Sequence, residues 1–122
     1  MTARILIADD NTDALLTLEI LLDSEGFAVR GVSKGSDVLP AMREFHPHAV
    51  VLDIKMPGLS GFEVARRIQA RYGEARPRLI ALSGHYRKEP DRLLSQAVGF
   101  DHHLAKPYDF QALLQVLPGV ES

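Results

Sequence analysis

Cysteine is absent from this chain of 122 residues, and so is tryptophan. Without cysteine the protein has neither disulfides nor thiolate chemistry, which suits a reducing compartment such as the cytoplasm. No apolar run approaches the ~20 residues that a membrane-spanning helix needs, and the first residues lack the cationic and then apolar pattern of a signal peptide. We therefore expect a soluble, cytoplasmic domain with no membrane insertion.

An excess of one charge is also lacking. Lys and Arg total 14 against 16 Asp and Glu, which gives a net charge of −2 and no general attraction for nucleic acid. The hydrophobic fraction of 46% and charged fraction of 25% are those of ordinary globular proteins. At this length the chain fits one core, so we expect a single domain over residues 1–122.

Five short apolar runs, bounded by polar or turn residues, predict buried strands. They are Arg4–Ala8, Phe27–Val32, Ala49–Leu52, Arg78–Leu82 and Asp101–Leu104. Segments with helical spacing lie between them, and alternating strands and helices favour parallel pairing through right-handed crossovers. The pattern predicts an α/β fold with a doubly wound, five-stranded parallel sheet.

The helical segments carry apolar stripes that we expect to face the core. The stripes are Ala14, Leu18, Leu21 and Leu22; then Phe62, Ala65, Ile68 and Tyr72; and last Phe110, Leu113, Leu114 and Leu117. Asn11 can cap the first helix and Gly26 can follow it, while Pro90 and Gly99 suit the two ends of the fourth. The second helix, near Ser36 to Phe45, should start close to Leu39 because Pro40 is tolerated only in a first turn.

Polar side chains follow four of the predicted strands. Asp9 and Asp10 follow the first, Asp53 the third, Ser83 the fourth, and Lys106 comes shortly after the fifth. Taken singly, most of these are ordinary turn formers, helix caps or surface residues. The carboxyl ends of parallel strands share one edge of a sheet, however, so three acids, a hydroxyl and an amine should meet there.

Four ordered motifs resemble the receiver domain of bacterial response regulators, from Arg4 to about Leu117. They are Ile5-Leu6-Ile7-Ala8-Asp9-Asp10-Asn11, Val50-Val51-Leu52-Asp53 with Met56-Pro57-Gly58, Ala81-Leu82-Ser83-Gly84, and Gly99 through Lys106-Pro107. The resemblance implies a flavodoxin-like (βα)5 fold with strand order 2-1-3-4-5. It also implies a signalling phosphoacceptor and not a stand-alone enzyme.

Clustered carboxylates repel one another unless a cation neutralises them, and their hard oxygens suit Mg²⁺. By the resemblance, Asp10 and Asp53 bind the ion directly, Asp9 holds it through water, and the backbone carbonyl of Lys55 contributes. A phosphohistidine on a histidine kinase or phosphotransfer protein then donates its phosphoryl group to Asp53. The Lys106 ammonium and the Ser83 hydroxyl stabilise the phosphoryl oxygens.

The resemblance also predicts a switch. The hydroxyl of Ser83 moves toward the phosphoryl group, and the ring three residues before Lys106 turns inward. That ring is usually Tyr or Phe, whereas here it is His103, so an exposed histidine with no coupling role is the alternative. The family commonly has a cis bond before Pro107, and we expect one.

Several alternatives stay open. A receiver-like module that binds partners without phosphorylation would usually have lost an acid or the lysine. An aspartate-dependent phosphohydrolase would have Asp where Lys55 stands, and the scattered histidines offer a weak case for a transition metal. Lys55 and His85 could influence hydrolysis of the phosphoryl group or face solvent. We expect a downstream protein partner at the fourth-helix, fifth-strand and fifth-helix face, with homodimerisation, cognate kinase and descent from a hybrid kinase left open.

Overall fold

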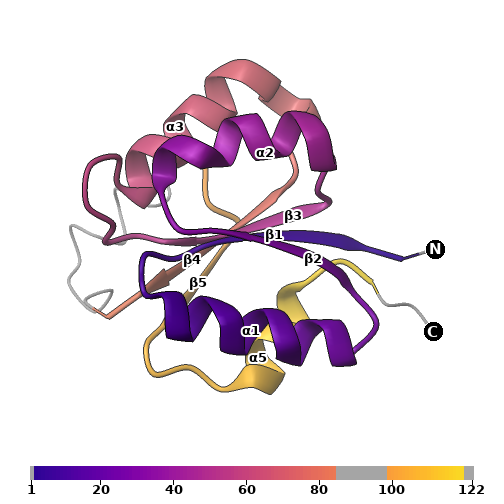
Figure 1. Cartoon of the computed structure of the whole chain (residues 1–122). Helices are drawn as coiled ribbons and strands as arrows, with labels where there is room; N and C mark the ends of the chain where they lie inside the picture. The colour runs from indigo at the N-terminus through magenta and orange to yellow at the C-terminus, as the bar shows by residue number, and fades with distance from the viewer. Residues whose placement is uncertain (1, 85–98, 120–122) are drawn as a thin grey trace.

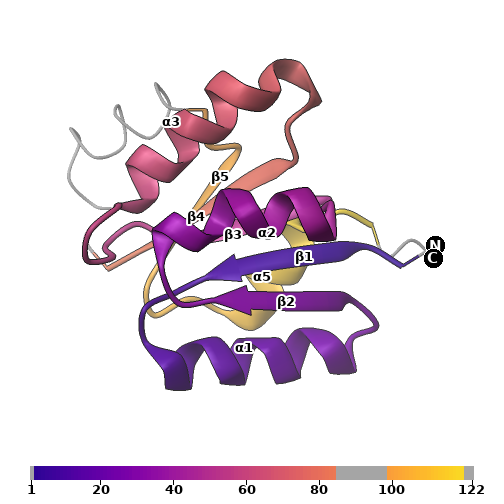
Figure 2. The same cartoon turned by 45° about the horizontal axis from the view of Figure 1, so that its top comes forward.

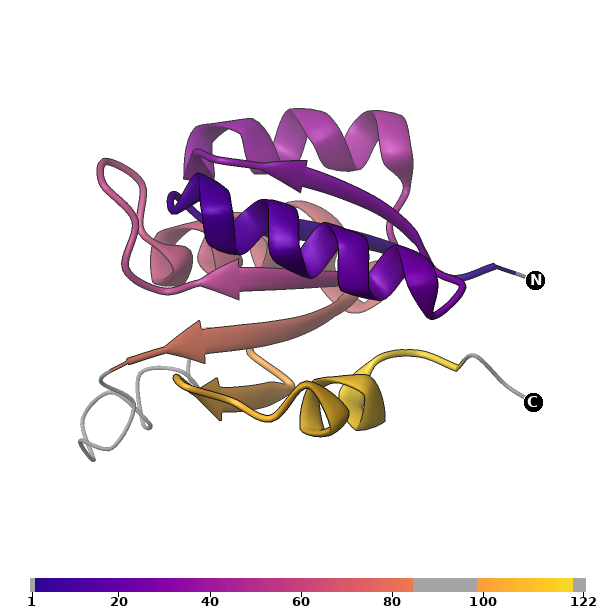
Figure 3. The same ribbon diagram turned by 60° about the horizontal axis from the view of Figure 1, so that its bottom comes forward.

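The computed structural model describes residues 2–84 and 99–119. These residues form a five-stranded sheet in the order β2-β1-β3-β4-β5, in which every neighbouring pair is parallel. The strands are β1 Arg4–Ala8, β2 Ala28–Val32, β3 Ala49–Asp53, β4 Arg78–Ser83 and β5 His102–Ala105. The strand arrowheads point to one edge of the sheet (Figure 3), so the carboxyl ends gather there. The predicted fold class and strand order are confirmed.

Helices cover both faces of the sheet. They are α1 Thr12–Ser24, α2 Val38–Phe45, α3 Gly61–Tyr72 and α5 Phe110–Val116, with 3₁₀ turns η1 Gly35–Asp37 and η2 Gly73–Ala75. Helices α2 and α3 lie on one face, and α1 and α5 on the other (Figure 1). The fourth helix that the sequence predicts, including Pro90, lies outside the described residues. No helix among those described is long and apolar enough to cross a membrane.

The second helix begins where the proline rule requires. Helix α2 starts at Val38 after the short turn η1, so Pro40 occupies the first turn, where its missing N–H costs no hydrogen bond. The turn at the other end places His46 in the left-handed region, with φ of 53°, and the guanidinium of Arg4 donates to the carbonyls of Phe45 and His46. Arg4 thereby satisfies carbonyls at the end of α2.

Alternate strand residues supply two separate hydrophobic layers. Ile5, Ile7 and Val51 pack beneath α1 and α5, whereas Leu6 and Val50 pack beneath α2 and α3. Burial of such a side chain contributes about 1.5–3 kcal/mol. The sheet lies between the two helical layers (Figure 2). This two-sided burial explains why the strands are nearly continuous apolar runs.

One predicted core stripe is wrong in part. In α1 the buried side chains are Leu15, Leu18 and Leu22, whereas Ala14 and Leu21 are exposed. The helix is rotated by about one residue from the predicted face, because a segment so rich in leucine offers more than one apolar stripe. The stripes of α3 and α5 are confirmed: their members are buried or pack against the two core clusters.

Candidate functional site at the carboxyl edge of the sheet

The polar residues that the sequence singles out converge at the carboxyl edge of the sheet. Asp9, Asp53 and Ser83 are the buried polar residues among those described, with exposed fractions of 4%, 6% and 7%. Asp10 is exposed beside them. Carboxylate oxygens of Asp9, Asp10 and Asp53 all lie within 4.8 Å of one another. Such burial of acids requires compensating positive charge.

Local hydrogen bonds fix the first acid. Asp9 Oδ1 accepts from the backbone N–H of Asn11 at 3.0 Å, and the Asn11 side chain in turn accepts from Ala14 N at 3.1 Å. Asn11 is therefore the predicted N-cap of α1. The Asp-Asp-Asn sequence closes the turn from strand to helix and orients a carboxylate at the same time.

The end of strand β3, at Asp53, is held by close packing that requires glycine. A Cβ at Gly61 would lie 2.7 Å from the carbonyl oxygen of Asp53 and 2.8 Å from Ile54 Cα. Gly61 N also donates to the Ile54 carbonyl at 2.9 Å. The start of α3 thus rests directly on the backbone at Asp53. Gly58, earlier in the same turn, has a positive φ of 77°, whereas Gly61 does not have a positive φ.

Lys106 supplies the positive charge. Its Nζ lies 3.3 Å from Asp53 Oδ2 and 3.8 Å from Asp9 Oδ2. Its backbone N–H donates to the Ser83 carbonyl at 2.9 Å, which joins the end of β5 to the end of β4. The Lys106–Pro107 peptide bond is cis, as predicted.

The electrostatics of Asp53 favour a bound cation. Burial raises the pKa of Asp53 from 3.8 to about 6; Lys106 opposes this increase, and the neighbouring Asp9 adds to it. The ammonium alone therefore leaves the acid cluster under-neutralised. Three hard carboxylates open to water on the Asp10 side form a donor set that fits Mg²⁺. The histidines form no comparable group in the part of the chain that the structure describes.

His103 is enclosed and not exposed as the alternative interpretation supposed. Its ring nitrogens are buried, and its ring packs edge-on against Phe100, with the centroids 5.6 Å apart. Phe100 packs in the same manner on Phe62 at 6.3 Å. A cavity of about 260 Å³, bordered by both His103 and Ser83, adjoins this row of rings.

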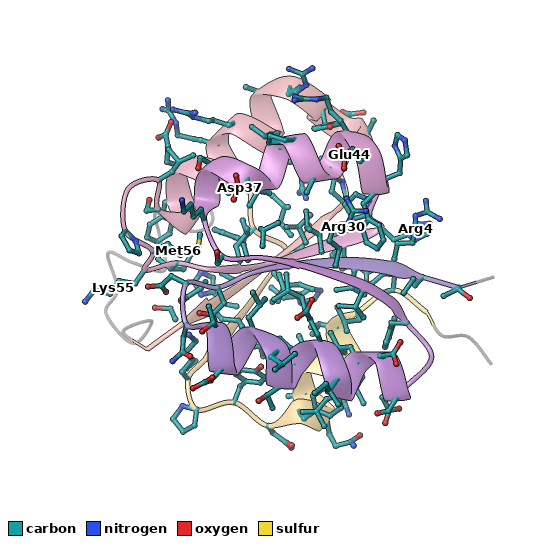
Figure 4. All side chains as sticks on the ribbon, viewed as in Figure 1. Arg4, Arg30, Asp37, Glu44, Lys55 and Met56 are labelled. Atoms are coloured by element: carbon teal, nitrogen blue, oxygen red, sulfur yellow. The ribbon has the colours of Figure 1, made fainter. Side chains whose placement is uncertain are left out.

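Lys55 approaches the Asp53 carboxylate with its backbone N–H and not with its side chain. Its N–H lies 3.4 Å from Asp53 Oδ1, a long hydrogen bond. Its ammonium group extends away from the body of the protein, whereas Met56 points inward (Figure 4). Met56 is 5% exposed and belongs to the core beneath α2 and α3. His85 lies outside the described residues.

Sequence reasoning missed Tyr108. Burial raises the pKa of its phenol, and the negative charge of Asp9 raises it further. Tyr108 also borders a cavity beside α1 with Asn11, Thr17 and Leu21. Its position two residues after Lys106 could have suggested that it lies near the site. Only the folded chain shows that it lies close to Asp9.

Comparison with known proteins identifies the family. The model of the response regulator receiver domain matches residues 5–118. Protein PilH of Pseudomonas aeruginosa is 32% identical over 119 residues, covering 97% of each chain. DNA-binding response regulator MtrA of Mycolicibacterium smegmatis is 34% identical over 108 residues, covering 88% of this chain and 46% of MtrA. The chain thus spans about half the length of MtrA and nearly all of PilH.

Solved structures agree with this assignment. One similar structure is the receiver domain of sensor histidine kinase PA1611 from Pseudomonas aeruginosa, which has a magnesium ion coordinated in its active-site cleft. It superposes on this chain with a TM-score of 0.84 at 27% identity, and the match covers 95% of this chain and 94% of that one. Chemotaxis protein CheY4 of Vibrio cholerae shares the fold, with a TM-score of 0.87 at 21% identity over 96% and 100% of the two chains. This chain belongs to the response regulator receiver domains of two-component signalling.

Proposed function

We propose that this domain accepts a phosphoryl group on Asp53 from a phosphohistidine, in a reaction that requires Mg²⁺. The observation that carries the proposal is the buried Asp53 carboxylate, 3.3 Å from the Lys106 ammonium and beside Asp9 and Asp10. Asp10 and Asp53 would bind the ion directly, Asp9 through water, with the backbone carbonyl of Lys55. When bound, Mg²⁺ would neutralise these acids and the charge on the incoming phosphoryl oxygens.

The residues of the chain have separate parts in the transfer. A carboxylate oxygen of Asp53 forms a bond to phosphorus while the bond from phosphorus to the donor imidazole nitrogen breaks, and the imidazole leaves with the electron pair. Lys106 stabilises one phosphoryl oxygen by charge, and the Ser83 hydroxyl donates a hydrogen bond to another. The acyl phosphate product is labile, so the signal decays unless it is renewed.

Phosphorylation would be read out through Ser83 and His103. Both border the cavity of about 260 Å³, which gives the His103 ring room to follow a displacement of Ser83. His103 lies on the edge strand β5, next to α5, so a change there alters the surface offered to a downstream protein. The partners are therefore a histidine kinase or phosphotransfer protein upstream and a protein that contacts the β5, α5 and fourth-helix face downstream.

A direct test is incubation with Mg²⁺ and a small phosphodonor, such as phosphoramidate or acetyl phosphate, followed by intact-mass measurement. The wild type should gain one phosphoryl group, and Asp53→Asn should gain none. Arg30→Gln, on the β2 edge where Arg30 pairs with Glu44 (Figure 4), is the control and should behave as the wild type does. A wild type that gains nothing would favour an interaction module that acts without phosphorylation.

A further inference from the structure

The cavity beside the proposed switch has a mainly apolar wall. Its volume is about 260 Å³, and it lies between the turn that joins β3 to α3 and the strands β4 and β5. Ile54 and Met56 from this turn, both buried, and Phe62 from α3 supply the apolar wall. Ser83 and His103 border the cavity on the side of the sheet. Water inside a protein needs polar partners, so a wall of this kind favours an apolar occupant.

Aromatic rings border one side of the cavity. Phe62 and His103 both line it, and Phe100 packs edge-on against each of them, with interplanar angles of 70° and 72°. A planar aromatic ligand could extend this row, because rings attract one another in edge-on and offset arrangements. The thioether of Met56 is a further favourable contact for an aromatic ring.

The cavity offers no partner for a charged ligand. No described residue that lines it is acidic, and the ammonium of Lys55 extends away from the body of the protein (Figure 4). An ion without a partner is unfavourable in such a place. Ser60 supplies a polar contact: its hydroxyl accepts from Glu63 N at 3.3 Å, and a hydroxyl also has a proton and a second lone pair. The occupant should therefore be uncharged, with a single polar group.

We propose that this cavity binds an uncharged, planar aromatic molecule of the size of indole, and that the bound ligand opposes the switch. An apolar cavity of about 150 Å³ accommodates benzene. The volume of about 260 Å³ here therefore has room for two fused rings. The effect on the switch rests on the proposed function, whereas binding to the unphosphorylated protein does not.

The ligand opposes the switch because the two compete for one space. In the proposed readout, Ser83 is displaced toward the phosphoryl group on Asp53, and the His103 ring follows through the cavity that both residues border. A ligand in the cavity blocks the path of the ring. Since coupling between two sites is reciprocal, phosphorylation must weaken ligand binding by the factor by which the ligand disfavours the switched state. The acids of the candidate metal site do not line the cavity, so they stay open to Mg²⁺.

The binding test is an NMR titration of the protein with indole in EDTA. For a ligand of about nine non-hydrogen atoms, we expect a dissociation constant of roughly 0.1–1 mM. Nuclear Overhauser effects from indole to the methyl groups of Ile54 and Met56 should locate it in the cavity. Phe62→Trp should weaken binding at least about tenfold, because the larger side chain fills the space. Tyr72→Trp is the matched control: Tyr72 ends α3 and packs on the same core, but does not line the cavity, so the affinity should not change.

The regulatory test repeats the titration with beryllofluoride and Mg²⁺, which mimic the phosphorylated state. Indole should then bind at least about fivefold more weakly, whereas Mg²⁺ alone should change its affinity less than about twofold. No binding up to ~5 mM, or Overhauser effects only to residues elsewhere, would overturn the site, and the wild-type spectra decide this even if Phe62→Trp does not fold. Equal affinity with bound beryllofluoride would overturn the effect on the switch. A protein that neither binds beryllofluoride nor takes up a phosphoryl group would refute the proposed function, and with it the effect on the switch, but not the indole site.

Discussion

Asn in place of Asp53 should stabilise the metal-free protein at neutral pH. A folded-state pKa of about 6 against an ordinary 3.8 means that the charged carboxylate is disfavoured in the fold. At about 1.36 kcal/mol per pH unit, the difference corresponds to about 3 kcal/mol. The amide retains burial costs of its own, and Lys106 loses its closer partner. We therefore expect a net gain of about 1–2 kcal/mol in the free energy of unfolding.

The pH dependence gives the sign of the effect. A group whose pKa is raised by folding binds more protons in the folded state, so its contribution to stability falls as pH increases from 3.8 to about 6. The advantage of Asp53→Asn over wild type should therefore be full above about pH 7 and vanish near pH 4. Lys106 and Asp9 remain in place in both proteins, so the comparison isolates the charge on Asp53.

Urea denaturation in EDTA, followed by circular dichroism at several pH values, measures the difference in unfolding free energy between Asp53→Asn and wild type. Mg²⁺ should reverse the order, because it binds and stabilises wild type but loses a ligand in Asp53→Asn. A variant less stable than wild type in EDTA at neutral pH would refute the argument. A stability difference that does not change with pH would show that packing, and not charge, controls the site.

Three further predictions concern Asp101, just before the start of β5, and then Gly61 and Lys106 of the candidate site. Asp101→Asn should lower the free energy of unfolding by about 1–2 kcal/mol, measured by urea denaturation. Burial would raise the pKa of Asp101, but hydrogen bonds from Arg76 at 2.8 Å and from Leu79 N outweigh it and lower this pKa. Unchanged stability would contradict this. Gly61→Ala should cost at least about 2 kcal/mol by the same assay, since its Cβ would meet backbone atoms of Asp53 and Ile54. Lys106→Ala should raise the pKa of Asp53 further, visible by carboxyl ¹³C NMR, and slow phosphoryl uptake at least about tenfold.

The sequence predicts the strands to within one residue at each end, because two-sided burial leaves continuous apolar runs between polar residues. The differences have local causes. The predicted fifth strand began at Asp101, but this side chain bonds to Leu79 N and Arg76, so the residue leads into β5 without belonging to it. The outward face of α1 could not be predicted from spacing alone, since leucine and isoleucine occupy positions on several sides of the helix.

The candidate site was predictable because each residue ends a strand, and parallel strands bring their ends to one edge. Two residues of the site, Gly61 and Tyr108, were not predictable in this way. Gly61 matters because two backbones approach closely, and Tyr108 because it lies near Asp9, and both facts depend on how loops pack in space. Spacing also could not show that the Lys55 side chain points away while its N–H faces Asp53.

The identity of the phosphorylated residue is the central claim, and one measurement tests it most directly. After treatment with phosphoramidate and Mg²⁺, borohydride reduction converts an aspartyl phosphate to homoserine, and peptide mass spectrometry locates the change. We expect homoserine at position 53 alone, dependent on Mg²⁺. Homoserine at position 9 or 10, or none in a folded protein that binds Mg²⁺, would contradict it.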